Sequence, residues 1–154
     1  MAKSVLYMSM SVDGYIAGPD DRPGNPGGDG FERLHRWFGD FSRPSGPTGV
    51  LFDEMDGAGA LLSGRRTAEQ VDHWDGDHGG RPIFVVSHRP PPPEVAALPK
   101  VTYVNDGVER AMAMAREAAG DRDVLVHGAT TAQAALIPAA APSPPGPRRG
   151  TARS

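Results

Sequence analysis

Cysteine is absent from the sequence, and tryptophan, tyrosine and phenylalanine are scarce, at 2, 3 and 5 residues. The lack of cysteine excludes a disulfide scaffold, a thiolate nucleophile and any metal centre with cysteine ligands. No hydrophobic run approaches the roughly 18 residues of a membrane span, and the first residues are too short an apolar stretch for a secretory signal. We therefore expect a cytoplasmic protein with no membrane partner.

An excess of positive charge is also absent. The 16 Lys and Arg are outnumbered by 19 Asp and Glu, so the net charge is -3, and the chain lacks the basic field that nucleic acid binding requires. Glycine and proline are abundant, at 20 and 16 of 154 residues, which indicates many turns and long loops. The length fits a single domain.

Short apolar runs alternate with helical patterns along most of the chain. Strands are expected at Ser4–Met10, Ala58–Ser63, Pro82–Ser87, Val101–Val104 and Asp123–His127, and helices at Asp29–Phe38, from Val50, at Thr67–Val71, at Val108–Ala119 and at Thr130–Leu136. This alternation predicts an α/β fold with a mostly parallel central sheet covered on both faces. Ligands bind such sheets beyond the carboxyl ends of the strands.

Two segments depart from this pattern. Residues 18–30 are rich in Gly, Pro, Asp and Asn, which is typical of a loop, and their length suits a mobile flap over a site. Residues 138–154 hold five prolines, three arginines and many alanines, and such a composition cannot bury enough surface to become ordered. We expect one domain over residues 1–137 and a disordered tail over residues 138–154.

Three strand ends carry side chains suited to binding an anion. Gly64-Arg65-Arg66-Thr67 joins a strand to a helix, whose N-terminal amide groups and neighbouring arginines suit phosphate. Gly128-Ala129-Thr130-Thr131 follows another strand in the same way, and Ser87-His88-Arg89 ends a third. Each also has a purely structural interpretation: solvated arginines at a helix entry, an ordinary helix cap, and a polar loop before a proline run.

The segment from His73 to His78 contains two His, two Asp and one Trp. Its spacing matches no common set of metal ligands. We interpret it as a solvated loop anchored by Trp74, and we expect no metal site.

Taken together, these segments resemble the dihydrofolate-reductase-like family, in its branch that contains the reductase domain of riboflavin biosynthesis. The resemblance rests on Ser9-Met10-Ser11-Val12-Asp13-Gly14-Tyr15-Ile16-Ala17, Leu62-Ser63-Gly64-Arg65-Arg66-Thr67, Phe84-Val85-Val86-Ser87-His88-Arg89, Val101-Thr102-Tyr103-Val104 and Val124-Leu125-Val126-His127-Gly128. It covers roughly residues 3–136 and implies a three-layer fold. It also implies an NADPH-dependent reductase that transfers hydride to a small, heterocyclic substrate.

The resemblance assigns roles residue by residue. It implies that Gly64, Arg65, Arg66 and Thr67 hold the pyrophosphate and 2'-phosphate region of NADPH, that Ser87, His88 and Arg89 flank its adenosine, that Gly128, Ala129, Thr130 and Thr131 cradle its pyrophosphate, and that Ser9, Ile16 and Ala17 line its nicotinamide. Two acids are candidates for proton donation: Glu32, on the first expected helix, and Asp13, which equally fits an Asp-Gly turn. Folate is not supported as the substrate.

After Leu136 the sequence leaves the family pattern. The family continues into further strands, whereas this chain turns to proline and alanine, so we expect an incomplete sheet with an exposed edge. Two readings follow. The chain is a reductase, with a homodimer completing its sheet, or it is a non-catalytic, truncated fragment that binds nucleotide.

Overall fold

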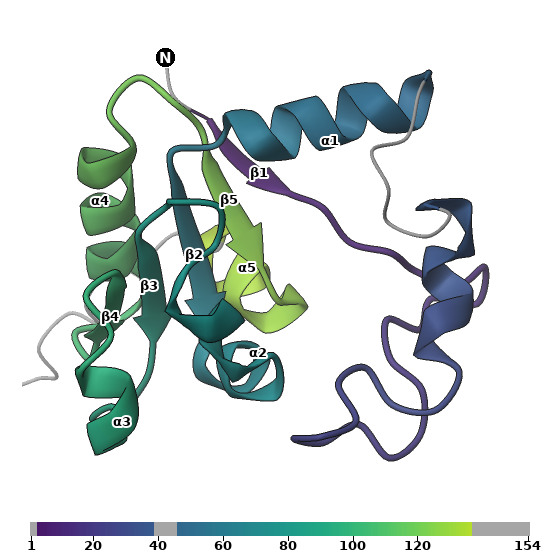
Figure 1. The fold of residues 1–154 in the computed structure, drawn as a ribbon, viewed down its shortest axis with the longest axis horizontal. Coiled ribbons are helices and arrows are strands. Elements are labelled where there is room, and N and C mark those ends of the chain that lie inside the picture. Colours follow the sequence, from purple (N-terminus) through teal and green to yellow (C-terminus); the bar gives the residue numbers. More distant parts are fainter. Residues whose placement is uncertain (1–2, 39–45, 137–154) are drawn as a thin grey trace, which may run out of the picture.

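Five short strands form one sheet in which every neighbouring pair is parallel (Figure 1). The strands are β1 (Ser4–Leu6), β2 (Ala60–Gly64), β3 (Ile83–Val86), β4 (Val101–Val104) and β5 (Val124–His127), in the order β1-β5-β2-β3-β4. The computed structural model describes residues 3–38 and 46–136. The expected tail and the end of the expected domain at residue 137 lie outside the described residues.

Helices cover both faces of the sheet, as the alternating pattern predicts. They are η1 (Phe31–Phe38), α1 (Pro47–Gly57), α2 (Arg65–Gln70), η2 (Asp72–Gly76), α3 (Pro93–Ala96), α4 (Val108–Ala119) and α5 (Ala129–Leu136). No helix among residues 3–38 and 46–136 is long and apolar enough to cross a membrane.

The core is divided between the two faces of the sheet because side chains alternate along each strand. On one face, Leu62, Phe84 and Val126 pack with the buried alanines of α4. On the other face, Leu61, Ile83 and Leu125 pack with Ala68 of α2. The central strands are buried on both faces, which is why they read as continuous apolar runs.

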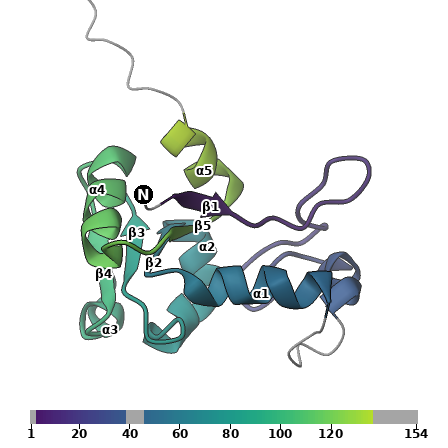
Figure 2. The same ribbon diagram turned by 90° about the horizontal axis from the view of Figure 1, so that it is seen from above.

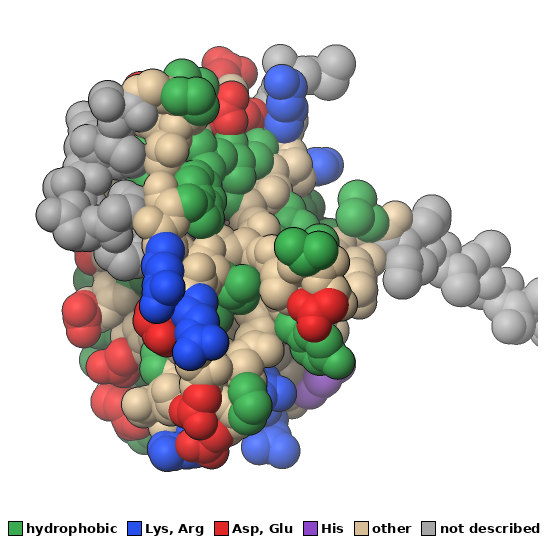
Figure 3. All heavy atoms as spheres, turned by 90° about the vertical axis from the view of Figure 1, so that its right-hand side faces the viewer, with side chains coloured by type: hydrophobic (Ala, Val, Ile, Leu, Met, Phe, Trp, Pro, Cys, Tyr) green, Lys and Arg blue, Asp and Glu red, His purple; other side chains and the backbone are tan. Residues whose placement is uncertain are grey.

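The N-terminal part of the chain stands apart from this core. Figures 1 and 2 show the chain leaving β1, running away from the sheet and forming η1 on the side opposite α4, before α1 returns along the sheet. Residues 18–30 form a loop closed by backbone hydrogen bonds from Gly18 N to Gly27 O (2.7 Å) and from Asp29 N to Pro19 O (2.7 Å). Figure 3 views this side and shows hydrophobic side chains at the surface.

Several sequence-based boundaries are confirmed, and others are wrong. The bounds of β4 and α4 agree with the prediction, and Gly120 ends α4 with a positive φ of 63°. The first strand is shorter than the predicted Ser4–Met10, because only Ser4–Leu6 pairs with β5. The helix predicted over Asp29–Phe38 is a 3-10 helix that begins at Phe31. The short helix α3 was not predicted.

The segment around Trp74 agrees with the expectation only in part. Trp74 packs against the core and the acidic residues beside it are exposed, but the segment is a short helix and His73 is only 3% exposed, with its Nε2 2.9 Å from the Tyr103 hydroxyl. The four non-glycine residues from Asp72 to Asp75 all have φ between 47° and 54°. This left-handed conformation costs roughly 1–2 kcal/mol per residue, and it forms the kinked helix η2.

Candidate functional site

Two strand-to-helix turns lie side by side at the carboxyl edge of the sheet. The neighbouring strands β2 and β5 are parallel, with Ser63 paired to His127. Gly64 follows Ser63 and leads into α2, and Gly128 follows His127 and leads into α5. The topology therefore brings together the two glycine turns that the sequence analysis singled out.

The two turns approach each other so closely that neither glycine has room for a side chain. A Cβ at Gly64 would lie 2.6 Å from Oγ1 of Thr131, and a Cβ at Gly128 would lie 2.8 Å from Oγ1 of Thr67. Gly128 also has a φ of 94°, which favours glycine. Each glycine thus accommodates the threonine of the other turn, and the pair forms a narrow cradle of backbone and hydroxyl groups.

The arginines beside this cradle already have carboxylate partners. Nη1 of Arg65 donates to both carboxylate oxygens of Glu69 at 2.8 Å, one helical turn further along α2. Nη2 of Arg66 donates at 3.0 Å to the Oδ2 atom and to the backbone oxygen of Asp21. The Arg66 side chain is 72% exposed, so it remains accessible to a ligand.

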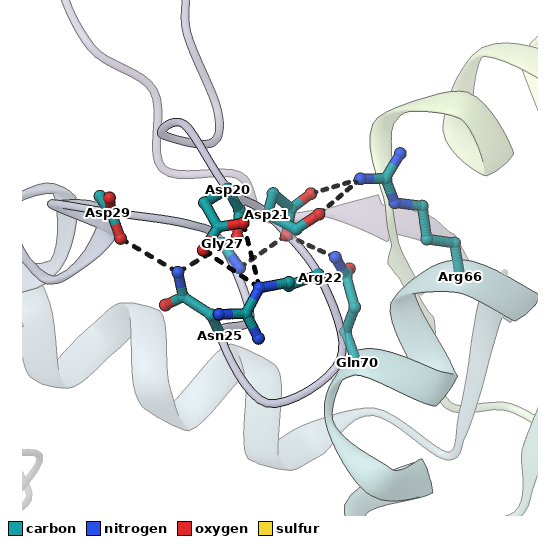
Figure 4. A network of polar contacts seen from close by, with 8 residues as sticks. All are labelled: Asp20, Asp21, Arg22, Asn25, Gly27, Asp29, Arg66 and Gln70. Carbon is teal, nitrogen blue, oxygen red and sulfur yellow. Dashed lines mark hydrogen bonds and ion pairs between the residues drawn. The ribbon is translucent and has the colours of Figure 1, made fainter.

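Asp21 links the loop of residues 18–30 to α2 (Figure 4). Its Oδ1 accepts hydrogen bonds from Nε2 of Gln70 and, at 2.9 Å, from the amide of Gly27. Because Asp21 is an anion held against Arg66, it occupies one of the positions from which a phosphate would contact that side chain. Sequence reasoning missed this residue, because one acidic residue in a polar loop gives no signal of a partner 45 positions away.

A single cavity of about 1360 Å³ lies over these turns. Pockets for small molecules usually measure about 300–1,000 Å³, so this one has room for a large cofactor together with a substrate. Thirteen of the sixteen predicted site residues line it: Ser9, Ile16, Ala17, Glu32, Gly64, Arg65, Arg66, Thr67, His88, Gly128, Ala129, Thr130 and Thr131.

The other three predicted residues are absent from the cavity lining. The Ser87 hydroxyl donates to the Arg89 oxygen at 2.7 Å and accepts from the Arg89 amide at 2.9 Å, so Ser87 closes its own turn. Asp13 is exposed, and its Oδ1 accepts a hydrogen bond from the Ser11 hydroxyl at 2.6 Å. Between the two candidate acids, the structure therefore brings Glu32 to the cavity and leaves Asp13 in a surface turn.

The cavity is also lined by large side chains that sequence reasoning missed. They are Tyr7, Phe31, Met55, Trp74 and His127, which come from the N-terminal part, α1, η2 and β5. The alternation along β5 places His127 on the same face as Leu125, a signal that could have indicated its direction. The position of Trp74 depends on the left-handed backbone of η2, and no sequence pattern predicts that conformation.

The surroundings shift the pKa values of two groups that line the cavity, Tyr7 and His127, in opposite directions. A hydrogen bond to Glu54, with burial and the Glu54 charge as further causes, raises the pKa of Tyr7 to about 12. Burial, and then the charge of His78, lower the pKa of His127 to about 4. Both side chains are therefore neutral at pH 7. Within residues 3–38 and 46–136, no three His, Asp or Glu side chains lie close enough together to hold a metal ion.

The all-parallel sheet, the helices on both faces and the cavity at the carboxyl ends define an α/β protein whose fold is consistent with the dihydrofolate-reductase-like class. The chain is similar in structure to a "putative riboflavin biosynthesis protein" from Shewanella sp. PV-4, with a TM-score of 0.55 and 24% sequence identity. The match covers 86% of this chain and 67% of the other. At that identity the likeness concerns the fold. No protein-family model and no curated protein matches the sequence.

Proposed function

We propose that this chain is an NADPH-dependent reductase of the riboflavin-biosynthesis reductase-like type. It would transfer hydride to a C=N or C=O bond of a small heterocyclic substrate. The fold similarity to the Shewanella protein supports this proposal. The proposal is also supported by the cavity lining, which includes nearly all the residues to which the family resemblance gives cofactor contacts.

The observation that carries the proposal is the glycine–threonine cradle. A pyrophosphate needs close approach to backbone amide groups, and side-chain-free turns beside the first residues of a helix permit that approach. The missing Cβ at Gly64 and Gly128 lets Thr131 and Thr67 place their hydroxyl groups beside these turns, so a pyrophosphate there would meet hydroxyl donors as well as amide groups. Of the two helices that follow, α5 has eight residues and begins directly after Gly128, so its first amide groups are available to an anion.

In this proposal the two ends of the cofactor have different partners. Arg66, with its exposed guanidinium, would contact the 2'-phosphate, and Ile16 and Ala17 would line the nicotinamide. NADPH would supply the hydride, and the substrate must also receive one proton. Glu32 is the candidate acid because its side chain lines the cavity.

The proposal is tested by thermal unfolding of the purified chain with saturating NADPH or NADH. A ligand that binds only the folded state at about 100 times its Kd adds about 2.7 kcal/mol to the free energy of unfolding. We expect NADPH to raise the midpoint more than NADH does, because only NADPH carries the 2'-phosphate that Arg66 would contact. Reduction is then followed as the loss of NADPH absorbance with candidate heterocycles.

Two matched variants test whether Arg66 causes the preference for NADPH. Arg66→Gln should reduce the preference for NADPH over NADH, whereas Arg110→Gln, on the exposed surface of α4, should leave it unchanged. Equal midpoints with and without NADPH would contradict the proposal.

A second candidate is nucleotide binding without reduction. The observation that favours it is the position of Asp13, which is bonded to Ser11 and absent from the cavity lining, so one of the two possible proton donors is not placed for catalysis. NADPH binding with no reduction, and equal binding of NADP, would support this candidate.

A further inference from the structure

Among residues 3–38 and 46–136, Arg81 is the only lysine or arginine that is buried, with 8% of its surface exposed. It lies shortly before β3 and is not part of the cavity lining. A guanidinium group stays charged at any ordinary pH, and a buried charge is costly unless partners surround it. The partners of Arg81 therefore indicate what this residue does.

On one side, the partners of Arg81 are backbone oxygens at the C-terminal end of α1. Nε donates to the oxygen of Ala58 at 3.0 Å, and Nη2 donates to the oxygen of Asp56 at 2.7 Å. The Asp56 carboxylate, at 3.4 Å, is 60% exposed and is a weaker partner. The last carbonyl groups of a helix have no partner within it and carry the negative end of its dipole. Arg81 therefore caps α1.

On the other side, Arg81 contacts His78, in the turn after η2. Nη1 donates at 3.0 Å to the backbone oxygen of His78 and at 3.1 Å to its Nδ1. Burial, and then the charge of Arg81, lower the pKa of His78. Because a guanidinium only donates, Nδ1 accepts and the neutral imidazole carries its proton on Nε2. The ring of His78 packs edge-on against Trp74, with centroids 5.3 Å apart at an interplanar angle of 85°.

The helix α1 depends on this end contact because it has no buried face. None of its residues is buried, and Val50 is 60% exposed. Figures 1 and 2 show α1 extending away from the sheet from its C-terminal end. Leu51 and Met55 of α1 line the cavity. Helices in proteins are usually held by a packed apolar face, so the direction of α1 depends on what holds its C-terminal end.

We propose that Arg81 is a positioning residue for the cavity. It holds the C-terminal end of α1 against the turn at His78, and so fixes Leu51 and Met55, on one part of the cavity wall, relative to Trp74 on another. That a substrate lies between these side chains rests on the proposed reductase function, whereas the positioning of α1 does not.

The test measures the distance between α1 and Trp74. The chain has no cysteine and two tryptophans, so Val50→Cys gives a single site for a dansyl-type label, and Trp37→Phe leaves Trp74 as the single donor. Time-resolved energy transfer between them gives the distribution of distances. We expect Arg81→Met to widen this distribution at least twofold. Arg81→Lys, which keeps the charge without the planar fork, should give an intermediate width.

The lysine variant also decides the test if the Arg81→Met chain does not fold, as judged by cooperative unfolding in urea. A distribution of unchanged mean and width in the folded Arg81 variants would overturn the proposal.

Two controls separate Arg81 from other causes. Tyr7→Phe removes the hydrogen bond that the Tyr7 hydroxyl donates to Glu54 of α1 on the exposed surface. Ile83→Val thins the core close to Arg81, at a residue with 0% exposure, and lowers stability without removing a contact of the guanidinium. Both should keep the narrow distribution. Widening by either control equal to that of Arg81→Met would overturn the proposal.

The rise of the unfolding midpoint with NADPH is measured on the unsubstituted and the Arg81→Lys chains. The rise should be the same in both, because the glycine turns and Arg66 do not contact Arg81. Its loss in the lysine variant alone would show that Arg81 supports the whole fold, and would overturn the proposal. Its absence from both chains would count against the reductase, while the distance measurement still decides the role of Arg81.

Discussion

The sheet body, residues 58–136, and the N-terminal part, residues 3–38 and 46–57, differ in where their hydrophobic side chains lie. Every fully buried hydrophobic residue among those the structure describes comes from the body. The large exposed hydrophobic residues among those described, apart from Leu136, lie in the N-terminal part: Leu6, Met8, Met10, Val12, Tyr15, Trp37 and Val50. The body is held by its own core, whereas the N-terminal part supplies one wall of the cavity.

This difference assigns separate roles to stability and binding. Phe31, Leu51 and Met55 line the cavity and are half-buried without a ligand. A ligand would therefore add contacts mainly to the N-terminal part, and substitutions should change stability mainly in the body.

The largest expected effect separates the two regions directly. Leu61→Ala empties a site of 0% exposure in the body and should lower the free energy of unfolding by about 2–5 kcal/mol. Met10→Ala, at 63% exposure in the N-terminal part, should change it by less than about 0.5 kcal/mol. Urea unfolding measures both, and similar losses would contradict the comparison.

Next in size is the effect of crowding the glycine cradle. Gly128→Ala meets both a positive φ and the Thr67 hydroxyl at 2.8 Å, and overpacking costs about 1–3 kcal/mol. Gly14→Ala has a similar φ of 90° in open space and is the matched control. We expect Gly128→Ala to be the more destabilising by that amount in urea unfolding, and equal losses would show that the close approach is unimportant.

A pH dependence should follow from His127. Burial lowers its pKa in the folded state from 6.5 to about 4, so between these values the unfolded state binds more protons. The contribution of His127 to the free energy of unfolding is therefore fully present above about pH 6.5. It is lost as the pH falls towards 4, by up to about 3 kcal/mol. The lowered pKa values of His73 and His78 act in the same direction.

The control for this prediction is His127→Phe, which has no proton to bind at that position. Its unfolding free energy should fall less steeply over the same pH range. An unchanged slope would assign the pH dependence to other groups.

The smallest effect concerns the contact between the two regions. Asp21→Asn removes the ion pair with the exposed Arg66 and should change stability by less than about 1 kcal/mol. On the proposed function it should also tighten NADPH more than NADH, because the carboxylate no longer competes with a phosphate for Arg66. Asp20→Asn, whose partner Arg22 lies within the loop, should leave both affinities unchanged in a calorimetric titration.

The sequence predicted the body far better than the N-terminal part. Strands such as Val101–Val104 are short apolar runs bounded by turn residues, and α4 ends at a glycine, so local chemistry fixes their positions. Met8 and Met10 carry the same β-forming pattern as Leu6 but have no neighbouring strand, so pairing, which is not local, ended β1 early.

The candidate site was predictable where it follows from strand ends. Gly64 ends β2 and Gly128 follows β5, and parallel neighbouring strands place such turns side by side. Trp74 was not predictable, because its position depends on four consecutive left-handed residues. The ion pair between Asp21 and Arg66 was not predictable either, because the conformation of the loop brings Asp21 to Arg66.

Hydrogen exchange followed by mass spectrometry, with and without NADPH, tests the central claim most directly, because it reports on both regions at once. The account predicts slower exchange in the turns at residues 63–67 and 127–132 and across residues 7–31, with β4 and α4 unchanged. Exchange that NADPH leaves unaltered in both turns, or slows only in β4 and α4, would contradict it.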